Sequence, residues 1–396
     1  MVLQPRSEAE VSAILSWANE QHVPAVPRGG GTKMGLGRLF SQTQEFICLS
    51  LKQMNQIVEH DADNLTVTVE AGATLKDLQT RISEKRQFLP LDPPGSEDAT
   101  VGGVLAANAS GPRRFGYGSA RDFVLGLRVV APDGRLLKFG GKSVKNVAGY
   151  DMCKLFIGSF GTLGVIAEAT FRLVPLPTTR RTVVQTFDSL EAASGAVRGL
   201  LASCLLPSAI ELVDRVAADH IFPVCNLKAD GSHAVAVLFE GFQDAVERQA
   251  RELSNKNPGR FATLAPDEAE RFWAALAGLL GSGTGGTRCK VSVPIASVAP
   301  IVAMATNLPA ATVSHAGSGI VYVFIPPEAS RPDRAVTRLR REAEDAGGHI
   351  VVESAPREVK EKADPWGKAG SAEAIMRRLR ETFDPNGIMN PGRFIV

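Results

Sequence analysis

The sequence is poor in cysteine, and the few it has form no metal or cluster motif. Five cysteines stand apart, at Cys48, Cys153, Cys204, Cys225 and Cys289, and no two share the C-x-x-C spacing of a zinc or iron–sulfur site. An odd and scattered set of thiols is typical of a reducing compartment. We therefore expect no iron–sulfur cluster on this chain.

Long apolar runs and an excess of one charge are also missing. No stretch of about 18 apolar residues could span a bilayer, and no charged-then-apolar signal segment stands at the N-terminus. We therefore expect a cytoplasmic protein that lies peripheral to the inner membrane only through partners. A formal net charge of +2, with no arginine stripe interleaved with aromatics, argues against nucleic acid as a partner.

The sequence is long enough, and apolar enough, to form more than one hydrophobic core. It contains 44% hydrophobic and 22% charged residues, as ordinary globular chains do. At 396 residues it is longer than the roughly 250–300 residues that one core usually serves. Pro175 and Pro177 close a first region, so we place a domain boundary near residue 178.

Local patterns in the first region predict alternating helices and strands. Ser7 and Glu10 form a capping-box pattern ahead of apolar residues at helical spacing, which predicts a helix. Residues 65–70 alternate with period two, as a half-buried strand does. Between about 180 and 350, two strand-then-helix alternations predict a ferredoxin-like antiparallel sheet with helices on one face. An amphipathic helix is predicted at 372–383.

The most informative local feature is Pro27-Arg-Gly-Gly-Gly-Thr32, which follows a short apolar stretch. Three consecutive glycines reach positive φ at little steric cost, so their N–H groups can turn toward one point. A pyrophosphate suits such a nest, because each hydrogen bond to a charged group contributes about 1.5–3 kcal/mol. Taken alone, a glycine-rich segment of this kind is more often an ordinary turn.

Two other glycine patterns do not carry the same meaning. Residues 281–286 match G-x-G-x-x-G, but a helical stretch precedes them and a strand follows, the reverse of a dinucleotide-binding order. Gly141-Lys-Ser143 resembles the end of a P-loop, but Leu136 stands where its first glycine belongs. No G-x-S-x-G elbow and no H-E-x-x-H motif is present.

Four motif groups taken together point to a family. They are Pro27–Thr32; Pro93-Pro-Gly-Ser96 with Thr100–Gly103 and Asn108–Gly111; Lys145–Asp151 with Lys154–Ile166; and Phe383–Arg393. This set resembles the FAD-binding oxidases of the vanillyl-alcohol oxidase/p-cresol methylhydroxylase (PCMH) type. The runs at 119–126 and 145–151 carry a narrower likeness to the FAD-binding E subunits of glycolate oxidases.

The resemblance implies an FAD site. The amides of Gly29, Gly30, Gly31 and Thr32 would wrap the pyrophosphate, and Asn390 would approach the isoalloxazine. The other cofactor-binding residues that it implies are Pro27, Arg28, Pro94, Gly95, Ser96, Thr100, Gly102, Gly103, Asn108, Ser110, Gly111, Gly161, Thr162, Gly164, Val165 and Ile166. Residues 27–37 hold no histidine or cysteine, so we expect non-covalent FAD. Tyr150 and Asp151 are as compatible with a buried structural pair as with a site.

The resemblance also exposes a departure. Relatives that oxidise D-2-hydroxy acids carry His-x-Gly-Asp-Gly-Asn-x-His, where this chain has His315–Tyr322 with Ser318, Ile320 and Tyr322 in place of Asp, Asn and His. His349 and Glu353 follow without the Glu-His-Gly pattern. Because a metal needs several N or O ligands, we expect no metal site and assign no catalytic residue. We interpret His315 as a turn or core histidine, with a catalytic base as the alternative.

The sequence therefore predicts an α+β fold with three parts. A two-subdomain PCMH-type FAD-binding domain spans 1–178, a ferredoxin-like α+β cap spans 179–350, and the segment 351–396 returns to the flavin domain. The resemblance implies the FAD-binding subunit of a glycolate (2-hydroxy-acid) oxidase complex in glycolate catabolism. Its expected partners are a second flavoprotein with an intact hydroxy-acid site and an iron–sulfur subunit. A self-sufficient D-2-hydroxy-acid dehydrogenase and a scaffold subunit with structural FAD remain as alternatives.

Overall fold

The chain folds into two compact units. The computed structural model describes residues 1–40, 45–95, 97–142, 150–228, 230–256, 260–281, 285–308 and 310–396. Unit 1 comprises Met1–Ser110, Gly118–Leu176 and Lys368–Val396, and unit 2 comprises Gly111–Tyr117 and Pro177–Gly367. Within these described ranges, no helix combines the length and the apolar character that crossing a bilayer requires.

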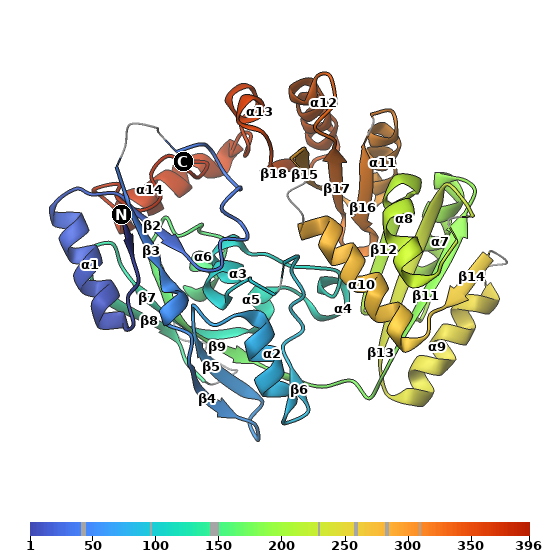
Figure 1. The fold of residues 1–396 in the computed structure, drawn as a ribbon, viewed down its shortest axis with the longest axis horizontal. Coiled ribbons are helices and arrows are strands. Elements are labelled where there is room, and N and C mark those ends of the chain that lie inside the picture. The colour runs from blue at the N-terminus through green and yellow to red at the C-terminus, as the bar shows by residue number, and fades with distance from the viewer. Residues whose placement is uncertain are drawn as a thin grey trace. The chain divides into compact units, whose positions relative to one another are not determined.

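Unit 1 is built from short helices and two main sheets (Figure 1). Its helices are α1 (Glu8–Glu20), α2 (Leu75–Ser83), α3 (Val101–Ala107), α5 (Ala120–Phe123), α6 (Cys153–Phe156) and α14 (Glu373–Phe383). Its strands are β1 (Val2–Leu3), β2 (Ala25–Arg28), β3 (Ile47–Ser50), β4 (Ile57–Asp61), β5 (Thr66–Glu70), β6 (Gln87–Phe88), β7 (Val124–Val130), β8 (Leu136–Gly140), β9 (Val165–Arg172) and β10 (Val174–Pro175).

The two sheets of unit 1 divide it into smaller parts. In the described chain, β1, β3 and β2 pair in parallel, and β4-β5-β9-β7-β8 form an antiparallel sheet. Helix α1 begins where predicted, because the Ser7 hydroxyl accepts from the Glu10 amide at 3.3 Å. Its apolar stripe of Val11, Leu15 and Ala18 is buried, which fixes the helix against the unit.

The C-terminal segment joins the parallel sheet of unit 1. The Ala25 amide donates to the Ile388 carbonyl at 2.8 Å, and the Asn390 amide donates to the Ala25 carbonyl at 2.9 Å. The turn that precedes this pairing is held by Asp384, which is 2% exposed and accepts from the amides of Ile388 and Met389. Residues near the end of the sequence thus lie beside β2, whose last residue opens the glycine loop.

Unit 2 is a sheet flanked by helices (Figure 1). Its helices are α4 (Arg114–Tyr117), α7 (Leu190–Leu201), α8 (Arg215–Ile221), α9 (Gln243–Lys256), α10 (Pro266–Gly281), α11 (Val298–Thr306), α12 (Pro332–Asp345) and α13 (Arg357–Lys362). Its strands are β11 (Thr179–Phe187), β12 (Ala209–Asp214), β13 (His233–Gly241), β14 (Arg260–Thr263), β15 (Thr287–Ser292), β16 (Ala311–His315), β17 (Ile320–Ile325) and β18 (His349–Ser354).

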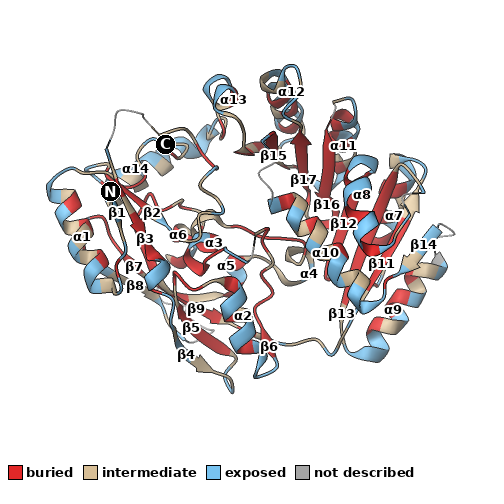
Figure 2. Ribbon diagram, viewed as in Figure 1, coloured by how far each residue is buried: buried red, intermediate tan, exposed pale blue. Residues whose placement is uncertain are grey.

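The sheet of unit 2 has apolar cores on both faces. Over the described residues its order is β14-β11-β13-β12-β16-β17-β15-β18, and each pairing is antiparallel. Helices α7, α9, α11 and α12 cover one face, while α8 and α10 pack on the other. The prediction of helices on one face was therefore wrong for this sheet. Figure 2 shows that the central strands are buried along their lengths. Successive residues of a strand face opposite sides of the sheet, so both faces need a cover of helices.

Candidate functional site

Two adjoining cavities lie in unit 1 around the glycine loop. The first, called here the glycine-loop cavity, measures about 90 Å³ and is lined by residues 27–34, Thr100, Gly103, Ala106, Ala107, Phe160, Asn390 and Arg393. The second, the inner cavity, measures about 50 Å³. Pro27, Arg28, Gly29, Thr100, Gly103 and Ala106 line both. The two cavities therefore lie on either side of shared residues.

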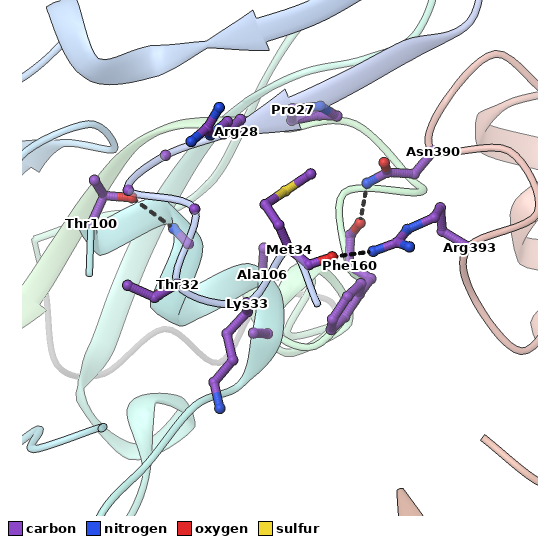
Figure 3. Close-up of a pocket in the computed structure, with 15 residues that line it drawn as sticks. Pro27, Arg28, Thr32, Lys33, Met34, Thr100, Ala106, Phe160, Asn390 and Arg393 are labelled. Carbon is purple, nitrogen blue, oxygen red and sulfur yellow. Dashed lines mark hydrogen bonds between the residues drawn. The ribbon is translucent and has the colours of Figure 1, made fainter. Parts of the chain in front are cut away.

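The glycine loop needs its glycines for both space and conformation. A Cβ on Gly30 would overlap the backbone carbonyl of Asp98, and Gly31 has a φ of +86° that L side chains rarely adopt. The loop thus packs directly on the segment that leads into α3, where the Thr100 hydroxyl accepts from the Gly103 amide at 3.3 Å. Figure 3 shows this loop curving past Thr100.

The amides of this loop suit an anionic group. Those of Gly30, Gly31 and Thr32 donate no hydrogen bond to any protein atom in the described part of the chain. Thr32 is exposed and the two glycines are half-buried, so these donors border the cavity. Amides in such partly exposed positions can donate to solvent or to a bound group. A pyrophosphate of FAD fits here because its oxygens would accept hydrogen bonds from these amides.

The wall opposite the loop is held by two residues in unusual backbone conformations. Phe160 has a φ of +61° and Asn390 a φ of +45°. The Phe160 amide donates to the Ala106 carbonyl at 2.9 Å, and its carbonyl accepts from Asn390 Nδ2 at 2.6 Å (Figure 3). Left-handed backbone at a bulky residue is strained, and it persists only where neighbours fix it. Here α3 and the C-terminal segment do so.

Arg393 ties the same wall to the loop. Its guanidinium donates to the carbonyls of Met34 and Leu36, at 2.7 and 2.5 Å, and also to the Arg38 carbonyl. It lies over the Phe40 ring, 4.3 Å from the ring centroid. Burial lowers the pKa of Arg393 from its usual range. The residues from 33 to 40 therefore depend on the C-terminal segment for their position.

The inner cavity has the opposite chemistry. Besides the shared residues it is lined by Leu51, Ala71, Gly102, Gly161, Gly164, Val165 and Ile166. Most of these side chains are apolar or absent, so the cavity suits a flat ring rather than a charged group. In the described lining of either cavity, no side chain is a histidine, a cysteine or a tyrosine.

The structure brings most predicted cofactor residues together, but not all. Those that line the two cavities are Pro27, Arg28, Gly29, Gly30, Gly31, Thr32, Thr100, Gly102, Gly103, Gly161, Gly164, Val165, Ile166 and Asn390. Those that do not line them are Pro94, Gly95, Asn108, Ser110, Gly111 and Thr162. Ser96 and residues 145–149 of the motif 145–151 lie outside the described residues, as do residues 282–284.

Several lining residues were missed from the sequence. They are Lys33, Met34, Leu51, Ala71, Ala106, Ala107, Phe160 and Arg393. Phe160 and Arg393 lie inside quoted motifs, so a signal existed for them. The alanines and Leu51 carry no such signal, because small apolar residues are as common in cores. Tyr150 is 95% exposed, and Asp151 Oδ2 lies 3.2 Å from Lys154 Nζ. Tyr150 and Asp151 therefore do not form a buried pair.

Unit 2 carries a separate buried polar cluster on the sheet face that also holds α8 and α10. His315, at the end of β16, is 1% exposed and its Nδ1 lies 2.8 Å from both carboxylate oxygens of Glu211. The Tyr322 ring packs edge-on against it, with centroids 5.2 Å apart. Burial, with the charges of Glu353 and Glu211, raises the pKa of Tyr322 well above its usual range.

The remaining charges of this cluster pair with each other. Arg288 Nε lies 3.2 Å from Glu353 Oε2, and both side chains are less than a tenth exposed. Tyr322 stands where the family resemblance implies the second histidine. Across the residues that the structure describes, no group of three or more His, Cys, Asp or Glu side chains could hold a metal ion.

Comparison with known families agrees with the cavities. A family model described as "FAD binding domain" matches residues 1–140. A second, described as "FAD linked oxidases, C-terminal domain", matches residues 176–394. Together they cover both units of the chain, and they confirm the resemblance predicted from the motifs.

Curated relatives match the chain along its whole length. Glycolate oxidase subunit GlcD of Bacillus subtilis is 32% identical over 418 residues, covering 100% of this chain and 88% of the relative. D-lactate dehydrogenase of Archaeoglobus fulgidus is also 32% identical, with coverage of 100% and 91%. D-lactate dehydrogenase [cytochrome] of Arabidopsis thaliana is 32% identical, with coverage of 100% and 73%.

Solved structures confirm the predicted α+β, PCMH-type fold. p-Cresol methylhydroxylase with substrate bound has a TM-score of 0.73 at 18% identity, covering 100% of this chain and 88% of that one. Alkyldihydroxyacetonephosphate synthase also has a TM-score of 0.73, at 20% identity, with coverage of 98% and 75%. At identities of 18% and 20%, this similarity establishes a shared fold only.

Proposed function

Since this chain belongs to the FAD-linked oxidases, we propose that it is the FAD-binding subunit of a glycolate (2-hydroxy-acid) oxidase or dehydrogenase complex. The glycine-loop amides would hold the pyrophosphate and the inner cavity the adenine, with Phe160 and Asn390 toward the isoalloxazine. When bound, FAD accepts two electrons from a donor and passes them to an acceptor. The chain's own residues bind it, orient it and limit access of water.

The observation that carries the subunit proposal is the buried Tyr322 that packs against His315. His315 is the histidine that the family resemblance retains; its Nδ1 is held by the Glu211 carboxylate, and its buried Nε2 has no hydrogen-bond partner among the described residues. Tyr322 beside it, fully buried with a raised pKa, is a poor ligand and a poor base at neutral pH. A partner with an intact hydroxy-acid site would therefore supply the oxidation, and an iron–sulfur partner would receive the electrons.

The test compares the chain alone with the chain among its partners. Purified protein loaded with FAD is mixed anaerobically with glycolate or D-lactate, and the flavin absorption band is followed. We expect little bleaching from the chain alone and full bleaching when the co-purified complex is used. A native-level pull-down identifies that complex through the visible spectra of a second flavin and an iron–sulfur cluster. Full bleaching of the isolated chain would contradict the proposal.

One alternative has an observation in its favour. Several relatives at about the same identity as the glycolate oxidase subunit are named D-lactate dehydrogenases. A self-sufficient D-2-hydroxy-acid dehydrogenase would bleach its flavin with one hydroxy acid and no partner. The same experiment therefore separates the two functions. A chain that neither binds FAD nor gains thermal stability from it would instead be a scaffold.

A further inference from the structure

Residues 33–40, called here the strap, continue from the glycine loop and line part of its cavity through Lys33 and Met34. Between β2 and β3 the described residues form no helix or strand, so the strap consists of turns. Its first turn is closed by the Met34 amide, which donates to the Gly31 carbonyl at 3.1 Å. Segments of this kind open locally at low free energy unless other segments tie them down.

Two arginines tie the strap to the C-terminal segment in both directions. From that segment, the Arg393 guanidinium donates to three strap carbonyls, and Figure 3 shows it directed at the carbonyl of Met34. From the strap, Arg38 donates through its amide to the Arg393 carbonyl at 3.1 Å and through Nη1 to the Phe394 carbonyl at 2.9 Å. Hydrogen bonds from charged donors are stronger than neutral ones. Each arginine therefore holds the backbone of the other's segment, and this exchange is called here the clasp.

Aromatic contacts extend the clasp on both sides. The Phe40 ring lies against the Arg393 guanidinium and stacks on Phe46, with ring centroids 5.0 Å apart. Phe394 stacks on Phe160, with centroids 5.9 Å apart and planes 6° apart. Since Phe160 and Arg393 also line the glycine-loop cavity, a change in the clasp alters the walls of that cavity.

The contacts of the clasp favour its opening and closing as a unit. Burial lowers the pKa of Arg393, and its carbonyl acceptors in the strap offset the cost of burying its charge. Moving the strap away from the C-terminal segment breaks the hydrogen bonds of Arg393 and of Arg38 together. Because buried charges are costly once their hydrogen bonds are lost, half-open arrangements are unfavourable. The strap and the C-terminal segment therefore separate together.

We propose that this clasp closes on bound FAD and controls its release. The proposal rests on the proposed FAD binding, in which the glycine-loop amides hold the pyrophosphate in the cavity that Lys33 and Met34 border. With the clasp closed, that wall stays in place, so FAD leaves only after Arg38 and Arg393 have released each other's segments. Linkage then requires that FAD stabilises the clasp by as much as the clasp stabilises bound FAD. Withdrawal of the C-terminal segment would therefore unload the cofactor.

The first test measures how fast FAD leaves. FAD-loaded protein is diluted far below its Kd, and the recovery of flavin fluorescence gives the dissociation rate. Arg38→Gln is the informative variant, because Arg38 is not among the described lining of either cavity and so acts on FAD through the clasp. We expect dissociation about tenfold faster, the loss of one charge-assisted contact. Arg38→Lys keeps a charged donor and should restore most of the wild-type rate.

The matched control for this variant is Arg81→Gln. It removes the same charge from α2 in unit 1, where Arg81 forms a surface ion pair with Glu84. The dissociation rate of this control should equal that of the wild type. A wild-type rate in Arg38→Gln overturns the clasp, and so does equal acceleration in Arg81→Gln.

The second test measures the reciprocal effect, that of FAD on the clasp. Amide hydrogen exchange is followed with and without saturating FAD, since exchange reports local opening. We expect FAD to slow exchange of the Arg38 amide about tenfold in the wild type and to lose that effect in Arg38→Gln. Protection of the Gly30 and Gly31 amides without protection at Arg38 overturns the clasp. A chain with no bound flavin spectrum contradicts FAD binding itself, and no hydroxy acid or partner is needed to tell these results apart.

Discussion

The Nδ1 atom of His315 lies 2.8 Å from each carboxylate oxygen of Glu211, a residue 104 positions earlier in the chain. The two are direct cross-strand neighbours on β12 and β16, and both side chains are buried. Removing one member of such a pair leaves the other without its compensation. We expect Glu211→Ala to lower the free energy of unfolding by about 3 kcal/mol, measured by urea denaturation.

A double-mutant cycle with Glu211→Gln and His315→Gln isolates this pair. The coupling energy should be about 1–3 kcal/mol, as for residues in direct contact. His315→Gln should also leave flavin reduction in the assembled complex unchanged, along with its pH profile. A loss of the reaction together with a shifted pH profile would instead identify His315 as the catalytic base of a self-sufficient enzyme.

The glycine loop yields a prediction about cofactor affinity. Gly30→Ala would force its Cβ into the Asp98 carbonyl, so the loop and its amides must move. We expect FAD to bind at least about 100-fold more weakly, because two or more charge-assisted contacts are lost. Fluorescence titration of the apo chain with FAD measures this.

The matched control makes the same substitution where space is free. Gly199 is exposed within α7, and a Cβ there meets nothing within 4 Å. Gly199→Ala should stabilise the protein by about 0.5–1 kcal/mol and leave FAD affinity unchanged. Unaltered FAD affinity in Gly30→Ala would remove the loop from the cofactor site.

Asn390 and Phe160 allow the contribution of one hydrogen bond to be separated from that of backbone strain. Asn390→Gly keeps the φ of +45° at low cost but loses the amide that donates to the Phe160 carbonyl. Asn390→Ala loses the amide and also adds left-handed strain of about 1 kcal/mol. Both substitutions should weaken FAD binding. In thermal unfolding, Asn390→Ala should be less stable than Asn390→Gly. Identical unfolding of the two variants would show that strain at this position is absent.

The sequence was most informative where chemistry forces a residue type. Three adjacent glycines, and an asparagine ahead of Pro391, occur where backbone must approach backbone closely or adopt positive φ, so the loop and Asn390 could be found. Helix α3 was not predicted, because its two glycines and alanines have the look of a loop. It forms because Thr100 caps it and Gly102 packs on Ala71.

Tertiary context explains what the sequence did not show. β12 is buried at every position, so it lacks the alternation that identifies a half-buried strand. The helices on the second face of the sheet follow from that burial, but their position depends on long-range pairing. The role of Phe160 likewise depends on Asn390, which lies 230 residues away in the chain.

His233 predicts a loss of stability on acidification. Its Nδ1 lies 2.8 Å from the Ser232 hydroxyl, while its buried Nε2 finds no partner in the described part of the protein. Burial lowers the pKa of His233 below its usual 6.5, with Asp214 opposing the shift. The unfolded chain therefore binds the proton first, so stability present above about pH 6.5 is lost as the pH falls through the lowered pKa.

The free energy of unfolding should change with pH by at most about 1.4 kcal/mol per pH unit through His233 alone. Urea denaturation of the wild type from about pH 8 to about pH 5 should show this pH dependence of the free energy of unfolding. The dependence should be weaker in His233→Gln. Burial and Lys290 lower the pKa of His349 in the same direction, so part of the slope remains. A variant with the full wild-type slope would mean that His233 is already able to take up its proton in the folded state.

The cavity lining predicts how FAD is attached. A covalent flavin link needs a nucleophilic side chain, and within the described lining there is no histidine, cysteine or tyrosine to form one. Acid precipitation should therefore leave the flavin in the supernatant, whereas colour in the pellet would show a covalent bond. Because FAD then binds as a dissociable ligand, FAD at 100 times Kd should raise the free energy of unfolding by about 2.7 kcal/mol. Gly199→Ala should retain that increment in full, whereas Gly30→Ala should retain at most about 0.4 kcal/mol of it at the same FAD concentration.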